Sequence, residues 1–269
     1  MSNYISVFGT LKDASFGGTN LSDKNYYCID FVKGLMPNQI VNKFDVPKRA
    51  GKIVVDKKFD VEYITAKGFL EASSHSDAIS KVKLLSAFLY SDEDKKFIRS
   101  DISTQYHLAQ YLDYVKVAIK KDYALFDLIF ECNDPFAYDT TADTDTQASV
   151  TTDDTTFIIA NSGHYHAYPT FTITFNQAQE HIYLQNNGIS GNRFDISKSF
   201  ATDDVLIING KTGVITLNGS NSPAGFGDGG DGSAEWVMLA TGNNELQIGT
   251  DDISIDVDIL TSFEKVYLS

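Results

Sequence analysis

Apolar and polar residues alternate along much of the chain, which is the pattern of β-strands with one buried face. The clearest case in the first half is a pair of runs on either side of a turn at Lys121 and Asp122. The apolar positions of the two runs are Val115, Val117 and Ile119, then Phe126, Leu128 and Phe130. This spacing predicts a β-hairpin whose two strands share a buried face.

The second half repeats this period without a helical pattern. Phe171, Ile173 and Phe175 alternate with threonines, and further strand-like runs cover residues 181–185, 204–208, 213–218 and 245–248. The last run alternates Ile253, Ile255, Val257 and Ile259 with polar residues. Turn signals such as Asn209-Gly210 and Asn218-Gly219 separate the runs. Short strands joined by regular turns predict a β-sandwich.

One segment has the period of a helix instead. Ser74 can cap its first turn, and Asp77 follows at the spacing of a capping box. The apolar positions Ile79, Val82, Leu84, Leu85 and Phe88 then recur at helical spacing. We therefore predict one amphipathic helix that ends near residue 90, in a chain that is otherwise mainly β.

A boundary between two domains is visible in the composition. Residues 139–156 read DTTADTDTQASVTTDDTT and offer little to bury. The segment is either a linker or a long solvated edge of the second domain, and we favour the linker because strand patterns resume on both sides. This divides the chain into domains at residues 1–138 and 157–269.

Charge separates the same two halves. Residues 1–138 hold 18 basic and 18 acidic side chains, whereas residues 139–269 hold 4 basic and 18 acidic ones, so the second half carries the whole formal charge of −14. A neutral domain can pack against copies of itself, and an acidic one stays solvated. Neither half has the basic stripe of a nucleic-acid-binding protein.

Candidate chemistry is sparse. His164 and His166 share a strand face and could hold a metal ion with His181, but a polar strand entrance explains them better. The acidic pairs at residues 153–154, 203–204 and 251–252 lie in turns, and the glycine-rich stretch 219–233 precedes no helix that could bind phosphate. Trp236 could stack on a sugar or belong to the core, and we favour the core.

The remaining signals do not favour an enzyme. Cys28 and Cys132 lie among apolar neighbours and are predicted to be small buried side chains rather than a disulfide framework. The first residues lack the pattern of a signal peptide, and no apolar run reaches the length of a membrane span. We predict no catalytic residues, no metal and no cofactor.

Several short motifs occur in a fixed order along the chain. Residues 46–51 read VPKRAG, an extended segment at residues 62–70 and the single helix follow, and residues 130–138 read FECNDPFAY. The second half contains GHYHAYPTFTITF at residues 163–175 and MLATGNNEL at residues 238–246. This ordered set resembles the distal tail (Dit) proteins of siphophages: the first motif is similar to their "vPgR.G" stretch, FECNDPFAY to the "F.c.DPf.Y" signature that closes their first domain, and the last two to motifs of their second domain.

The resemblance implies an architectural protein. Its first domain would be a β-sandwich or barrel-like domain with one helix, and its second a galectin-like or carbohydrate-binding-module-like β-sandwich. Six copies would form a ring through their first domains, and DNA would pass through the channel without specific binding. The partners implied are the major tail tube protein, a tail-associated or tail-tip protein and receptor-binding proteins. The implied location is the tail tip of a virion, after assembly in the host cytoplasm.

Two points stay open from the sequence. The acidic sandwich could instead recognise a cell-wall saccharide, which would make the protein an adhesin-like module. Residues 34–45 (GLMPNQIVNKFD) show no clear strand or helix period, and they form either an arm to a neighbouring subunit or a loop over their own core. The candidate arm residues are Leu35, Met36, Ile40, Val41 and Phe44.

Overall fold

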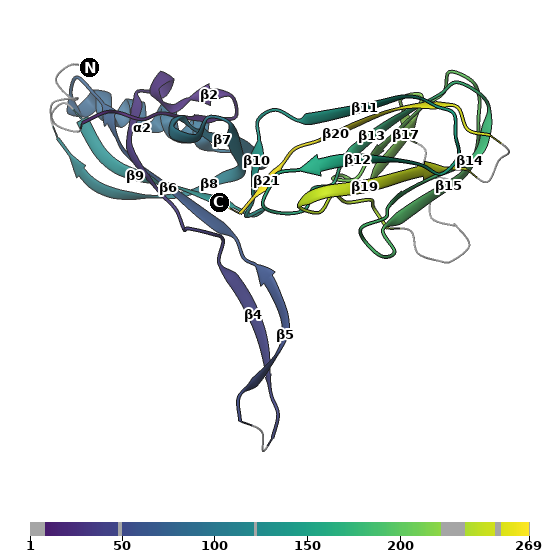
Figure 1. The fold of residues 1–269 in the computed structure, drawn as a ribbon. Coiled ribbons are helices and arrows are strands. Elements are labelled where there is room, and N and C mark those ends of the chain that lie inside the picture. The colour runs from purple at the N-terminus through teal and green to yellow at the C-terminus, as the bar shows by residue number, and fades with distance from the viewer. Residues whose placement is uncertain (1–8, 48–49, 121–122, 222–234, 251–253, 269) are drawn as a thin grey trace. The chain divides into compact units, whose positions relative to one another are not determined.

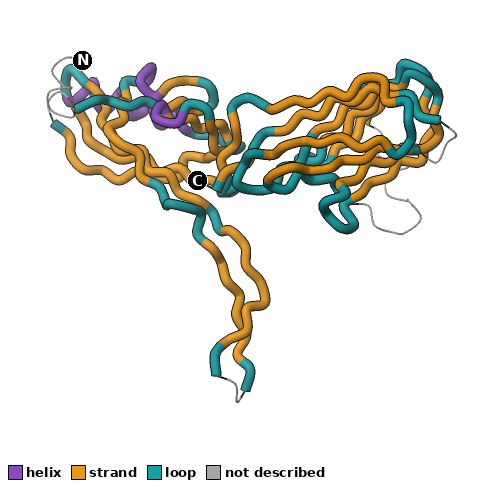
Figure 2. Tube along the Cα trace, in the orientation of Figure 1, coloured by secondary structure: helices purple, strands orange, loops and turns teal. Residues whose placement is uncertain are grey.

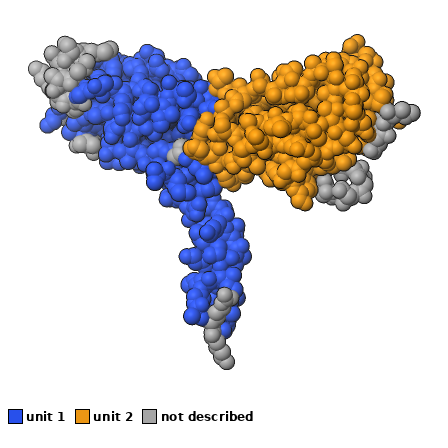
Figure 3. Space-filling model, viewed as in Figure 1, with its two compact units in different colours: residues 1–140, 268–269 blue, residues 141–267 orange. Residues whose placement is uncertain are grey.

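The computed structural model describes residues 9–47, 50–120, 123–221, 235–250 and 254–268, and forms two compact units. Unit 1 covers residues 1–140 and 268–269, and unit 2 covers residues 141–267 (Figure 3). Within the described ranges, no helix is long and apolar enough to cross a membrane. Both units are built mainly from strands, as the alternating pattern predicts (Figure 2).

Unit 1 is an antiparallel sheet with one long helix against it (Figure 1). The strands follow the order β2-β1-β7-β8-β9-β6-β3, and β10 pairs with β8. Their bounds are β1 Ala14–Phe16, β2 Thr19–Asn20, β3 Tyr26–Val32, β6 Glu62–Glu71, β7 Lys95–Arg99, β8 Gln105–Ile119, β9 Tyr123–Cys132 and β10 Ala137–Asp139. Two short 3-10 helices, η1 Leu21–Lys24 and η2 Ser100–Ile102, complete the unit.

The predicted hairpin is the pair β8 and β9, and one of its faces forms the core of unit 1. Phe126, Leu128 and Phe130 are buried as predicted, and Phe130 packs against Phe97 with ring centroids 4.5 Å apart. The alternation wrongly predicts that Val115 is buried, since its side chain is 53% exposed. Register shifts in β8 between Tyr111 and Asp113 change which residues face the core. The turn residues Lys121 and Asp122 lie outside the described residues.

The single helix, α2 His75–Leu89, is confirmed together with its cap. The Ser74 side chain accepts a hydrogen bond from the Asp77 backbone N–H at 3.1 Å. The buried helix residues are Ala78, Leu85 and Leu89, with Val82 and Phe88 partly buried. Ile79 and Leu84 are 44% and 69% exposed, so the apolar face of the helix is wider than the face that unit 1 covers.

Unit 2 is a sandwich of two antiparallel sheets. One sheet has the order β11-β20-β13-β16-β17-β18 and the other β12-β19-β14-β15. Their bounds are β11 Asp143–Val150, β12 Thr155–Asn161, β13 Thr170–Phe175, β14 Gln179–Asn186, β15 Arg193–Phe200, β16 Val205–Asn209, β17 Val214–Leu217, β18 Ser220–Asn221, β19 Gly242–Gly249 and β20 Val257–Phe263. The short strand β21 Val266–Tyr267 belongs to neither of these two sheets. Alternate residues of both sheets face inward, and Phe175 stacks on Phe200 at 4.2 Å.

The linker predicted at residues 139–156 is not what the structure shows. The middle of that segment is β11, which pairs antiparallel with β20 from Asp143 opposite Phe263 to Val150 opposite Val257. The strand lies at the edge of its sheet and its side chains, apart from Val150, are exposed or half-buried. An edge strand needs few apolar residues, and threonine favours extended backbone. The rejected alternative, a solvated edge of the second domain, is therefore correct.

Candidate functional site

A two-stranded hairpin in unit 1 is exposed along most of its length. It consists of β4 Gln39–Asp45 and β5 Lys52–Phe59, and within the described residues these strands pair only with each other (Figure 1). We call this hairpin, residues 39–59, the arm. An isolated two-stranded hairpin is marginally stable in water. We therefore expect a long hairpin of this kind to bind a partner.

The arm exposes large apolar side chains. Phe44 lies opposite Ile53 in the strand register, and Val55 lies where the register shifts, between the partners of Lys43 and Asn42. Their exposed fractions are 58%, 41% and 69%. Val54, on the other face, is 45% exposed. Apolar residues exposed together on an extended hairpin are typical of an interaction surface.

The predicted interface residues fall on the arm or at its root. Phe44, Ile40 and Val41 lie in β4, whereas Leu35 and Met36 precede it and are 95% and 43% exposed. Residues 39–45 show no clear period in the sequence yet form β4, and the period is absent because both faces of the strand are open. The strand β5 was not predicted, although its Ile-Val-Val run was a strand signal.

The root of the arm is anchored to unit 1 by specific contacts. Asp60 N–H donates to the Asn38 carbonyl at 2.8 Å, and the Phe59 ring meets Phe136 edge-on at 5.4 Å. Gly34 N–H donates to the buried Glu62 carboxylate at 3.1 Å. These contacts fix the point at which the arm leaves the sheet.

A cationic pocket of about 220 Å³ lies beside this root. Leu35, Arg99 and His107 are among the residues that line it, and Lys33 Nζ is 3.1 Å from His107 Nε2. Burial first, and then the charges of Lys33 and Arg99, lower the pKa of His107 to about 3. Burial also lowers the pKa of Lys33.

The motif that closes the first domain has a structural role. Tyr138 donates from its hydroxyl to Asp134 Oδ2 at 2.5 Å, and Phe136 N–H donates to Asp134 Oδ1 at 3.3 Å. Tyr138 also stacks on Tyr106 of β8 with centroids 5.6 Å apart. The Asp-Pro-Phe-Ala-Tyr sequence therefore turns the chain back onto β8. In the "vPgR.G" stretch, Lys48 and Arg49 lie outside the described residues.

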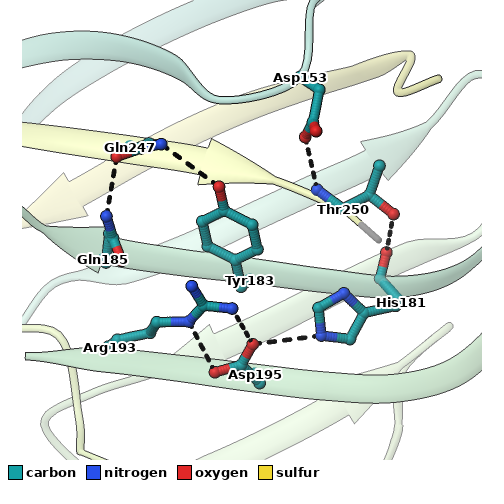
Figure 4. A network of polar contacts seen from close by, with 8 residues as sticks. All are labelled: Asp153, His181, Tyr183, Gln185, Arg193, Asp195, Gln247 and Thr250. Atoms are coloured by element: carbon teal, nitrogen blue, oxygen red, sulfur yellow. Dashed lines mark hydrogen bonds and ion pairs between the residues drawn. The ribbon is translucent and has the colours of Figure 1, made fainter. Parts of the chain in front are cut away.

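Unit 2 carries a connected polar network on one sheet face (Figure 4). His181, Tyr183 and Gln185 alternate with the core residues Ile182 and Leu184, so they lie on the opposite face of β14. Asp195 accepts from the Arg193 guanidinium at 2.6 and 2.9 Å, and one of its oxygens is 3.2 Å from His181 Nε2.

The same network encloses its tyrosine. The Arg193 guanidinium lies 3.8 Å from the centre of the Tyr183 ring, and the Tyr183 hydroxyl accepts from Gln247 at 3.3 Å. A Cβ at Gly249 would come 2.4 Å from that hydroxyl, so glycine lets the ring lie on the sheet. Tyr183 is only 6% exposed, whereas a sugar that stacks on an aromatic ring needs an open face.

The other candidates from the sequence are placed apart from one another. His164 packs edge-on against Tyr267, His166 packs against Tyr165 and Tyr168, and His181 belongs to the polar network. Among the described residues, no three His, Cys, Asp or Glu side chains form a group that could hold a metal ion. Of the glycine-rich stretch, residues 222–234 lie outside the described residues.

The single tryptophan and the cysteines have structural surroundings. Trp236 is half-buried, and its ring would be 3.5 Å from a Cβ at Gly213. Cys28 and Cys132 are buried and not joined in a disulfide, as predicted. Burial raises the pKa of Cys132 to about 12 and raises that of Cys28 as well, which keeps both thiols protonated.

Comparison with known proteins agrees with this architecture. Residues 17–132 match the phage tail protein RIFT-related domain, and residues 162–265 match the C-terminal domain of the siphovirus-type tail component. The Dit protein (gp 19.1) of phage SPP1, described as a hub of the adsorption apparatus in phages that infect Gram-positive bacteria, has the same fold. It superposes with a TM-score of 0.79 at 14% identity, over 96% of this chain and 100% of that one.

The chain belongs to the siphophage distal tail (Dit) protein family. It is therefore a structural component of the phage tail, and its place is in the virion. A chain of the phage P2 baseplate, in its activated conformation with calcium, matches this Dit protein with a TM-score of 0.50 at 9% identity, over 94% of this chain and 98% of that one. No curated protein sequence matches significantly.

Proposed function

We propose that this Dit protein forms a closed ring of six copies that joins the tail tube to the baseplate. Unit 1 forms the ring, and each arm contacts the next copy. The apolar side chains that the arm exposes beyond its root carry this proposal. A contact between two different surfaces that repeats around an axis closes into a ring when the rotation fits.

The other partners follow from this position. The major tail tube protein would contact one side of the ring and a tail-associated or tail-tip protein the other. DNA would pass through the central channel without sequence-specific contacts. The acidic second half would remain at the solvated periphery, where receptor-binding proteins could attach, and assembly would take place in the host cytoplasm. Each contact between copies should bury about 1,200 Å² or more in total.

The test removes the apolar surface of the arm without disturbing the core. In Phe44→Ser with Ile53→Ser, both changes affect exposed side chains, so we expect the thermal midpoint to stay within a few degrees of the parent. Sedimentation velocity should show hexamers for the parent and monomers for this variant.

A matched control makes the same change elsewhere. Ile158→Ser with Val214→Ser replaces two exposed apolar strand residues of unit 2, and it should leave hexamers intact. If the arm variant forms hexamers over the same range of protein concentration as the parent, the arm is not the ring contact.

A further inference from the structure

An apolar groove of about 200 Å³ runs between α2 and the strands β8 and β9. Val82, Ser86 and Leu89 line it from the helix, and Tyr111, Tyr114 and Leu125 line it from the strands. The Ser86 hydroxyl already donates to the Val82 carbonyl at 2.9 Å. Because this hydroxyl is satisfied within the helix, the groove suits an apolar occupant.

The groove continues onto exposed apolar surface. Ile79 is three residues before Val82 and seven before Ser86, so it lies on the same helix face, and it is 44% exposed. On the opposite wall, Tyr114 is 53% exposed. This is the part of the apolar helix face that unit 1 leaves uncovered.

Acidic residues follow the helix that lines the groove. Asp92, Glu93 and Asp94 follow the end of α2 after two intervening residues, and the hydroxyl of the exposed Tyr90 donates to Asp92 at 2.8 Å. Residues 75–94 hold four acidic and two basic side chains, a net charge of −2. An occupant with apolar side chains and positive charge would complement both features.

The arm of another copy has this combination. Its residues 39–59 hold six basic and two acidic side chains, a net charge of +4, whereas the rest of residues 1–138 holds twelve basic and sixteen acidic ones, a net charge of −4. Phe44 and Ile53 form an exposed apolar pair across this basic hairpin, and Val55 is exposed two residues further along β5.

We propose that the face of the arm with Phe44 and Ile53 packs into the α2–β8–β9 groove of the next copy, with the arm lysines towards the acidic residues that follow α2. This inference rests on the ring proposed above and names the two surfaces that meet in it. The donor surface and the acceptor surface are different, so each copy gives one contact and receives one.

A charged substitution in the groove tests the acceptor. Ser86→Arg puts a charge into the apolar groove at a position that is exposed and helical, so the fold should persist. Ser80→Arg is the matched control, since Ser80 is exposed and also donates back along the helix, to Ser76, but lies about 120° away around α2. We expect hexamers for Ser80→Arg and monomers for Ser86→Arg.

Complementation then shows that the two surfaces belong to one contact. The arm variant Phe44→Ser with Ile53→Ser keeps its groove, and Ser86→Arg keeps its arm. An equimolar mixture of the two monomers should give a dimer of twice 29.7 kDa, about 59 kDa. A mixture that stays monomeric, or a Ser86→Arg variant that forms rings like the parent, overturns the proposal.

Disulfide trapping distinguishes two ways in which the proposal could fail: the arm binds a surface other than this groove, or no ring forms. The native cysteines are buried, so Phe44→Cys with Ser86→Cys introduces the reactive pair. Mild oxidation should give a ladder of covalent multimers, which either single variant and the pair Phe44→Cys with Ser80→Cys should not give. If no ladder forms and the parent is hexameric, only the groove is ruled out as the acceptor. If no ladder forms and the parent is monomeric, the ring is ruled out as well.

Discussion

At the scale of single residues, polar groups set deep in the aromatic core hold the sheet of unit 1 together. Tyr26 has no exposed surface, and its hydroxyl donates to the carbonyls of Ala66 and Phe126 at 2.7 and 2.8 Å. These residues belong to β6 and β9, so the tyrosine of β3 links three consecutive strands at one end of the sheet. Gly68 accommodates it, because a Cβ there would lie 2.7 Å from the Tyr26 hydroxyl.

Removing this hydroxyl should cost stability. Tyr26→Phe removes the hydroxyl from which both buried carbonyls accept a hydrogen bond. We expect the free energy of unfolding to fall by about 1–3 kcal/mol. Tyr63→Phe is the control, because its hydroxyl donates to Glu131 from a side chain that is 42% exposed. It should change stability by less than about 0.5 kcal/mol. Equal effects of the two changes in urea unfolding would contradict this view of Tyr26.

His107 should make unit 1 sensitive to acid. Its pKa of about 3 lies below the value of about 6.5 expected in the unfolded chain. Between these values the unfolded chain binds a proton that the folded chain does not, so stability is complete above pH 6.5 and falls as the pH drops towards 3. The slope should reach about 1.4 kcal/mol per pH unit.

The measurement is the free energy of unfolding from pH 7 to pH 4, compared between variants. His107→Gln should lose part of the parent's slope, while His75→Gln, at an exposed position, should keep it. A His107→Gln variant whose slope equals that of the parent would show that another group causes the acid sensitivity.

At the scale of elements, α2 depends on its capped first turn. The Ser74 hydroxyl accepts from Asp77 N–H, and the Asp77 carboxylate in turn accepts from the Ser73 backbone and hydroxyl at 2.8 and 3.0 Å. This differs from a capping box, in which the carboxylate would return to Ser74 N–H. The sequence spacing was right, but the return contact lies one residue earlier.

Loss of the cap should therefore be measurable. Ser74→Ala should lower the free energy of unfolding by about 1 kcal/mol. Ser80→Ala, in the exposed middle of the same helix, should be neutral or stabilising, because alanine is the better helix former there. Chemical unfolding followed by circular dichroism measures both, and an unchanged Ser74→Ala midpoint would contradict the role of the cap.

Elements whose two faces differ in burial were predictable from the sequence. The helix, the β8–β9 hairpin and the strands of unit 2 show their period because one face is buried and the other is not. β11 was missed because it is an edge strand with threonine and aspartate on its open positions. The sequence indicated a possible arm at residues 34–45 but not its two strands, because neither of their faces is buried within the chain and no apolar period arises. Of the side chains that line the groove, Val82, Leu85, Phe126 and Leu128 were predicted on apolar faces, but its open side depends on side chains that only the fold brings together.

At the scale of the whole molecule, the charge distribution fits a division of labour between its parts. The arm is basic, the rest of the first half is mildly acidic, and the second half carries −14. Like charges should keep the second halves of neighbouring copies apart, while opposite charges favour the arm against the first half of another copy. The net charges of these regions therefore favour association of copies through residues 1–138.

The most direct test of the central claim is the mass and symmetry of the purified full chain. Light scattering after size exclusion, with negative-stain images of the same peak, should show six times 29.7 kDa, about 178 kDa, and a six-fold ring with an open centre. A monomer of 29.7 kDa across a concentration series up to about 200 μM, well above the micromolar range of specific interfaces, would contradict ring formation through the arm.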